Sequence, residues 1–196
     1  MSISLIGPGR VSFGVMLRAV VVATEVAEGA IAMAPLFVGL ATHGVCIRLG
    51  AVRQLARPIS SRLFGGNKTY RGIACVAAGT AVGFGVIRPG LLAAIHASDL
   101  LRVGFAVGAA AMIAELPNSF LKRRLGIAPG TQTRGFRGFA FHVLDQVDVV
   151  FGAWAVLAWF AVPTWARLAG SLGSVYAGHQ VLSLVGYWLG MRSTVR

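Results

Sequence analysis

The sequence predicts an all-α membrane protein, a single domain over residues 1–196 with about five transmembrane helices. Of the 196 residues, 56% are hydrophobic and only 12% are charged, whereas an ordinary soluble domain carries about 25% charged residues. So few charges cannot cover a surface that faces water. We therefore expect the hydrocarbon of a bilayer to surround most of the chain.

Five stretches of the sequence are apolar enough to cross a bilayer, which takes about 20 residues each. They are residues 19–41, 73–95, 100–121, 143–162 and 168–189. The second is apolar as far as Ile87 and reaches full length only if it continues past Pro89. Between the stretches, we expect charged loops at about 48–72 and 122–142.

The distribution of Lys and Arg predicts the orientation, because these residues are enriched in cytoplasmic loops. Thirteen of the 18 lie in three segments that fall on one side of a five-span protein: Arg48, Arg53, Arg57, Arg62, Lys68, Arg71, Lys122, Arg123, Arg124, Arg134, Arg137, Arg192 and Arg196. The other five are Arg10, Arg18, Arg88, Arg102 and Arg167. We expect a multi-pass protein of the cell membrane with its N-terminus outside and its C-terminus in the cytoplasm.

The net charge of +12 indicates anionic partners. Because the charges lie between apolar runs, membrane lipids and phosphates suit them better than nucleic acid, which we do not expect as a partner.

Glycines recur inside the apolar stretches, where small residues let helices approach closely. They include Gly79, Gly83, Gly85, Gly104, Gly108, Gly173 and Gly178. Gly104 and Gly108 form a GxxxG motif, which we assign to packing within the chain, while a homodimer stays open.

A first polar motif, GNKTYRG at residues 66–72, stands directly before the second apolar stretch. Lys68 and Arg71 lie about one turn apart if a helix begins here, and Thr69 could cap that helix. Glycines and a helix N-terminus suit a phosphate. The alternative is a solvated basic loop that only fixes the topology.

A second motif, ELPNSFLKR at residues 115–123, ends the third stretch. Ionisable groups inside a membrane are costly, so Glu115 and Asn118 are candidates for function. Pro117 frees a backbone carbonyl one turn earlier. Lys122 and Arg123 would lie at the level of the lipid headgroups, where snorkelling alone could explain a basic residue.

The third motif, DQVD at residues 145–148, opens the fourth stretch. Asp145 and Asp148 share one helical face, where two like charges would repel unless a divalent cation such as Mg²⁺ joined them. A charge–dipole role suffices for one aspartate but not for two.

Other polar residues are weaker candidates. His142, one turn from Asp145, could be a ligand but suits the headgroup level better, and for His179 a hydrogen bond between helices is favoured. We assign no function to Glu25 and Glu28.

In order and spacing, the three motifs resemble those of the CDP-archaeol synthase family, a family of CTP-dependent cytidylyltransferases related to CDP-diacylglycerol synthases. The resemblance runs from about residue 34 to the C-terminus. It implies transfer of CMP from CTP to a lipid phosphate, an archaeal-type ether lipid or a related phosphatidate, with Mg²⁺ as cofactor.

The resemblance also implies roles for the motif residues. Asp145, Asp148 and Lys122 would be catalytic, and Asp145, Asp148 and Glu115 would hold the metal. Phosphates would be bound by Asn67, Lys68, Thr69, Arg71, Asn118 and Arg123.

Two alternatives remain open. One is another transferase of phospholipid synthesis. The other is a small membrane transporter or scaffold, which would account for Glu115 but not for the loop motifs.

Overall fold

The computed structural model describes residues 13–93, 95–129, 131, 135–188 and 190. Within these residues the chain is helical, with one isolated β-bridge between Pro58 and Thr69. The helices are α1 (Phe13–Arg48), α2 (Tyr70–Ile87), α3 (Ala97–Arg124), α4 (Gly135–Leu157) and α5 (Trp165–Trp188), with short 3₁₀ turns η1 (Arg53–Leu55) and η2 (Gly90–Leu92). The all-α prediction is confirmed.

Four of the five helices, α1 to α4, are long and apolar enough to cross a membrane. Helix α5 has 24 residues, so its length also suffices, but it is less apolar. Its polar residues are Arg167, Ser171, Ser174, His179, Gln180 and Ser183.

Most helix bounds differ from the apolar stretches, and the largest differences concern α1, α2 and α4. Helix α1 runs from Phe13 to Arg48, beyond the expected 19–41 at both ends, and α4 ends at Leu157, before the expected residue 162. Helix α2 ends at Ile87 instead of continuing to residue 95, because Arg88 has a left-handed backbone (φ 46°) and Pro89 has no N–H to donate. Helix α4 begins at Gly135, eight residues before the expected stretch. Hydropathy reports which residues suit lipid, and a helix can continue beyond them through a polar residue such as Arg137.

Several expectations fall on residues outside the described part of the chain. These are Arg10, Arg134, Arg192 and Arg196 in the charge count, Ala94 within the second stretch, and Leu189 at the end of the fifth.

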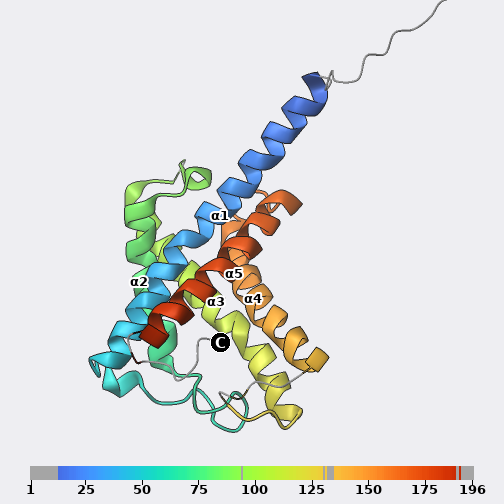
Figure 1. The fold of residues 1–196 in the computed structure, drawn as a ribbon. Helices are drawn as coiled ribbons and strands as arrows, with labels where there is room; N and C mark the ends of the chain where they lie inside the picture. Colours follow the sequence, from blue (N-terminus) through green and yellow to red (C-terminus); the bar gives the residue numbers. More distant parts are fainter. Residues whose placement is uncertain (1–12, 94, 130, 132–134, 189, 191–196) are drawn as a thin grey trace, which may run out of the picture.

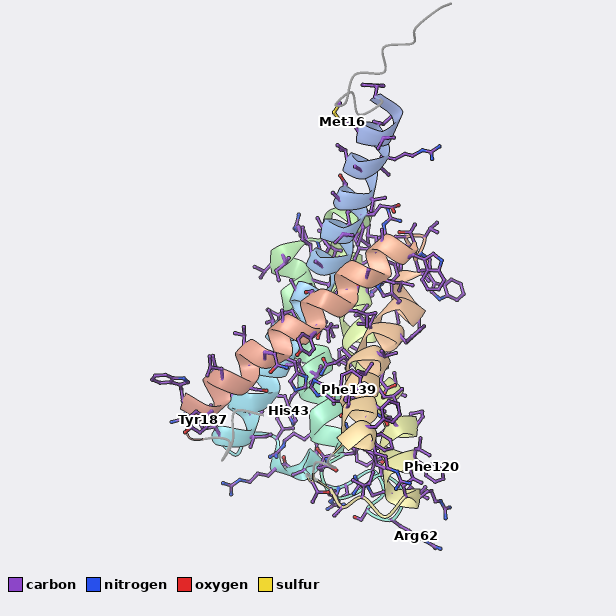
Figure 2. All side chains as sticks on the ribbon, turned by 45° about the vertical axis from the view of Figure 1, so that its right-hand side comes forward. Met16, His43, Arg62, Phe120, Phe139 and Tyr187 are labelled. Atoms are coloured by element: carbon purple, nitrogen blue, oxygen red, sulfur yellow. The ribbon has the colours of Figure 1, made fainter. Side chains whose placement is uncertain are left out.

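Helix contacts run in the order α4–α3–α2–α1–α5, and α5 also touches α4. In Figure 1, α5 runs obliquely across the bundle. Helices α1, α3 and α5 end, and α2 and α4 begin, at one end of the bundle. We call it the basic end; it includes the loop of residues 49–69 and residues 125–129 after α3. The first part of α1 projects beyond the other helices at the opposite end, and Figure 2 places Met16 on it.

Glycines lie where helices approach most closely. A Cβ atom at Gly104 or Gly108 would come within 3.0 Å of atoms of α2, which confirms the assignment of this GxxxG motif to packing within the chain. Gly79 and Gly83 pack on α1 in the same way. Gly173 was also expected at a contact, but no atom lies within 4 Å of the position a Cβ would take there.

Helix α5 crosses α1 at its tightest contact. A Cβ at Gly170 would overlap the carbonyl oxygen of Val26. Nearby, Ser171 Oγ donates to the carbonyl of Gly29 (3.0 Å) and accepts from Trp154 Nε1 (2.9 Å). This buried set of hydrogen bonds joins α1, α4 and α5.

We therefore predict that Gly170→Ala destabilises the protein by about 1–3 kcal/mol, because the new methyl group meets backbone that cannot move aside. A lowered melting temperature in detergent micelles would show it. Gly173→Ala on the same helix is the matched control and should melt at or above the wild-type temperature. Equal melting of the two variants would contradict this packing.

Candidate active site

Three polar side chains share one face of α3 near its end. Glu115, Asn118 and Lys122 are spaced by three and four residues, so they lie one above another. Asn118 is buried, with 7% of its surface exposed. The helix continues through Pro117 without ending. An otherwise apolar helix thus presents an acid, an amide and a base along one line.

Asp145 of α4 lies opposite this line. Lys122 Nζ is 2.6 Å from Oδ1 and 2.8 Å from Oδ2 of Asp145. Asn118 Nδ2 donates to the same Oδ1 at 2.8 Å. Hydrogen bonds between charged groups are the stronger kind, and these join the second and third motifs of the sequence.

Asp148 lies one turn further along α4. Asp145, Glu115 and Lys122 act on it electrostatically. Its Oδ2 atom is buried and has no hydrogen-bond partner among the described residues. The two aspartates therefore share one face, as the sequence predicts, and one of them has an oxygen available for a ligand.

The first motif joins the same cluster through Lys68, which forms an ion pair with Glu115. Both side chains are mostly buried, at 18% and 20% exposure. Thr69 Oγ1 accepts a hydrogen bond from the backbone N–H of Gly72 at 3.1 Å. Thr69 is therefore the N-cap of α2, as predicted.

Two arginines at the basic end carry buried N–H groups without a protein partner. They are Nε of Arg71 and Nε and Nη1 of Arg123, judged among the described residues. A buried guanidinium group is costly unless it is paired, and phosphate oxygens match its geometry. Figure 2 shows that Arg62 points away from the bundle, so not every basic residue of the loop belongs to this cluster.

Asn67 differs from the other predicted phosphate-binding residues. It is exposed, and its amide oxygen lies beside Gly65. The structure gives it no contact with the carboxylates of α4.

The donor set fits a metal ion only if a substrate completes the coordination. Within the described part of the chain, no three His, Cys, Asp or Glu side chains are placed to hold a metal. Glu115 is paired with Lys68, and Asp145 with Lys122. Mg²⁺ commonly takes one or two carboxylates together with phosphate oxygens. The buried, unpartnered oxygen of Asp148 suits that arrangement.

Sequence reasoning missed both ion pairs of the site. Glu115 lies 47 residues from Lys68, and Lys122 lies 23 residues from Asp145. No periodicity links positions so far apart. The available signal was that acids and bases in apolar helices need partners of opposite charge.

Glu25 and Glu28 have partners at the opposite end of the bundle. Thr164 Oγ1 donates to Glu25 at 3.1 Å, and Arg167 Nε donates to Glu28 at 2.9 Å. These bonds hold the start of α5 against α1, far from the cluster.

The two histidines of interest lie along the contact between α4 and α5. Nδ1 of His179 is 3.2 Å from Nε2 of Gln146, as expected for a hydrogen bond between helices. The ring of His142 meets the edge of the Tyr176 ring, with 5.9 Å between centroids.

Comparison with known proteins gives a consistent result. Residues 33–194 match a family model described as CarS-like, CDP-archaeol synthase. No solved structure matches the chain.

Three relatives are each named CDP-archaeol synthase. One from Methanoregula boonei is 33% identical over 139 residues, which is 65% of this chain and 78% of the relative. One from Saccharolobus islandicus is 31% identical over 134 residues, 67% of this chain and 72% of the relative. One from Haloarcula marismortui is 40% identical over 95 residues, 45% of this chain and 47% of the relative. The family match spans the second part of α1, helices α2 to α5 and all three motifs, so this multi-pass membrane protein belongs to the CDP-archaeol synthase family.

Proposed function

We propose that this protein transfers CMP from CTP to a lipid phosphate. The observation that carries the proposal is the cluster at the basic end. There Lys122 contacts Asp145, Asp148 has a buried oxygen without a partner, and Arg71 and Arg123 have N–H groups without a partner among the described residues. Carboxylates for a divalent cation and cations for phosphates are the two requirements of phosphoryl transfer.

The reaction needs no nucleophile from the protein. An oxygen of the lipid phosphate attacks the α-phosphorus of CTP and forms a new P–O bond. The bond from that phosphorus to the oxygen bridging the β-phosphate breaks, and pyrophosphate leaves with the electron pair. Catalysis then depends on positioning and on neutralising charge.

The basic residues of the cluster supply the positioning. Lys68 and Arg71 from the start of α2, with Lys122 and Arg123 from the end of α3, would hold the triphosphate and the lipid phosphate. Asn118, which already touches Asp145, would orient a phosphate or the metal's ligands.

Mg²⁺ is the cofactor that this donor set favours. Asp145 and Asp148 would hold it, and Glu115, which acts electrostatically on Asp148, would assist either as a ligand or by orienting one. When bound, the ion offsets the negative charge of the triphosphate.

The orientation of the protein follows from the same residues. The excess of Lys and Arg at the basic end supports a cytoplasmic site in the cell membrane, the side on which CTP is available. The lipid chains would remain between helices in the bilayer while the headgroup reaches the cluster. An isoprenoid ether lipid phosphate or a related phosphatidate fits this description.

Asp148→Asn should abolish incorporation of labelled CMP into lipid, because the variant loses a carboxylate charge that the metal requires. The protein should still insert and purify normally. Asp99→Asn is the matched control, since Asp99 pairs with Arg102 on the exposed first turn of α3 at the opposite end. Full activity of Asp148→Asn would disprove the metal assignment.

Arg123→Gln should lower kcat/KM for CMP transfer at least about tenfold, as expected when a charged hydrogen bond to a substrate phosphate is lost. Arg124 is the neighbouring control, because it is exposed and stacks on the ring of Phe120 (4.9 Å). Steady-state rates of Arg123→Gln and Arg124→Gln measure the difference. Equal rates would remove Arg123 from the site.

A further inference from the structure

Gln146 lies between the two aspartates in the sequence but faces a different helix. Successive residues of an α-helix are turned by about 100°. Asp145 therefore meets Asn118 and Lys122 of α3, whereas Gln146 meets His179 of α5 at 3.2 Å. At the level of the active site, α4 thus has polar groups on two faces.

The Gln146 side chain is buried but not fully hydrogen-bonded. Only 5% of its surface is exposed. Its Oε1 atom is buried and has no partner among the described residues. Leaving such an oxygen unpaired is costly, and a leucine would fill similar space without that cost. This cost points to a partner that the protein itself does not supply.

The side of α5 that contacts α4 at this level is polar. His179 and Tyr176, at helical spacing, form a short polar stripe: His179 reaches Gln146, and Tyr176 is 51% exposed. The stripe also meets α4 at His142, through Tyr176. These groups carry no permanent charge, so they suit an uncharged polar part of a ligand and not a phosphate.

The surroundings of this polar seam are apolar. Val181, Leu184 and Val185 of α5 are 45–60% exposed, as residues in contact with lipid chains would be. Figure 1 shows α5 and α4 diverging towards the basic end. In Figure 2, Tyr187 near the end of α5 lies well away from Phe139 near the start of α4. The hydrocarbon chains of a lipid would fit between the diverging ends of α4 and α5, with the headgroup at Asp145 and Asp148.

We propose that Gln146, positioned by His179, binds the oxygens that link the hydrocarbon chains to the backbone of the lipid phosphate. The inference rests on the proposed function. An amide can turn over and exchange its oxygen and nitrogen, so Gln146 can keep a bond to His179 and donate N–H to an ether or ester oxygen. Because Gln146 adjoins Asp145 in the chain, such a contact places the lipid phosphate beside the carboxylates.

Binding measured without turnover tests this inference. An ether-linked dialkylglycerol phosphate in detergent micelles is titrated against the intact protein in the absence of CTP, with tryptophan fluorescence as the readout. CTP affinity is measured separately with Mg²⁺ present. Gln146→Leu should weaken lipid binding about three- to tenfold, the loss expected for one hydrogen bond, and leave CTP affinity unchanged.

Two further variants make the result decisive. His179→Phe removes the same hydrogen bond from the other side and should also weaken lipid binding, so it decides the question if Gln146→Leu does not fold. Gln180→Leu, on the exposed face of α5, should bind like wild type.

Unchanged lipid affinity with a lower melting temperature would reduce the Gln146–His179 pair to a structural contact. A selective loss of CTP affinity would assign Gln146 to the nucleotide instead. Either result overturns the inference. Failure of wild-type protein to transfer CMP would refute the proposed function separately, because the binding assay does not depend on turnover.

Discussion

The contact of Asp145 with Lys122 and Asn118 is the interaction on which the site depends. It joins the end of α3 to the early part of α4 within 2.8 Å, where an unpaired carboxylate would be costly. A second ion pair, between Lys68 and Glu115, attaches the first loop to α3. Four charges from distant parts of the sequence thus neutralise one another, and Asp148 keeps a buried oxygen unpaired.

Close packing of small residues makes this contact attainable. Gly152 of α4 lies against Ala110 and Ala111 of α3, where a Cβ would come within 2.7 Å of the neighbouring helix. Because the helices run antiparallel, about two turns further on the same approach sets Asp145 opposite Asn118. In lipid, small residues let two helices approach closely. Here the close approach of α3 and α4 brings Asn118 and Lys122 next to Asp145.

Much of the fold, and the residues that gather in the candidate site, could be predicted from the sequence. Apolar length predicts the helices. The cost of ionisable groups in lipid marks Glu115, and the shared face of two like charges marks Asp145 and Asp148. The pairing of those groups could not be predicted, because it depends on how helices distant in sequence dock. Hydropathy did not predict where α2 ends, because the left-handed backbone of Arg88 determines that position. It also grouped α5 with the other four apolar stretches, although polar residues along α5 make it less apolar than they are. Gln146 was passed over because a single amide between two aspartates carries no periodic signal.

Metal binding by the intact protein tests the central claim most directly. Two of the carboxylates already have lysine partners, so the protein alone should hold a divalent ion weakly, and the oxygens of a nucleotide should complete the site. Titration with Mn²⁺ in place of Mg²⁺, followed by electron paramagnetic resonance, should show weak binding without CTP and binding at least tenfold tighter with CTP. Equally tight binding with and without the nucleotide, or no binding with it, would contradict the account.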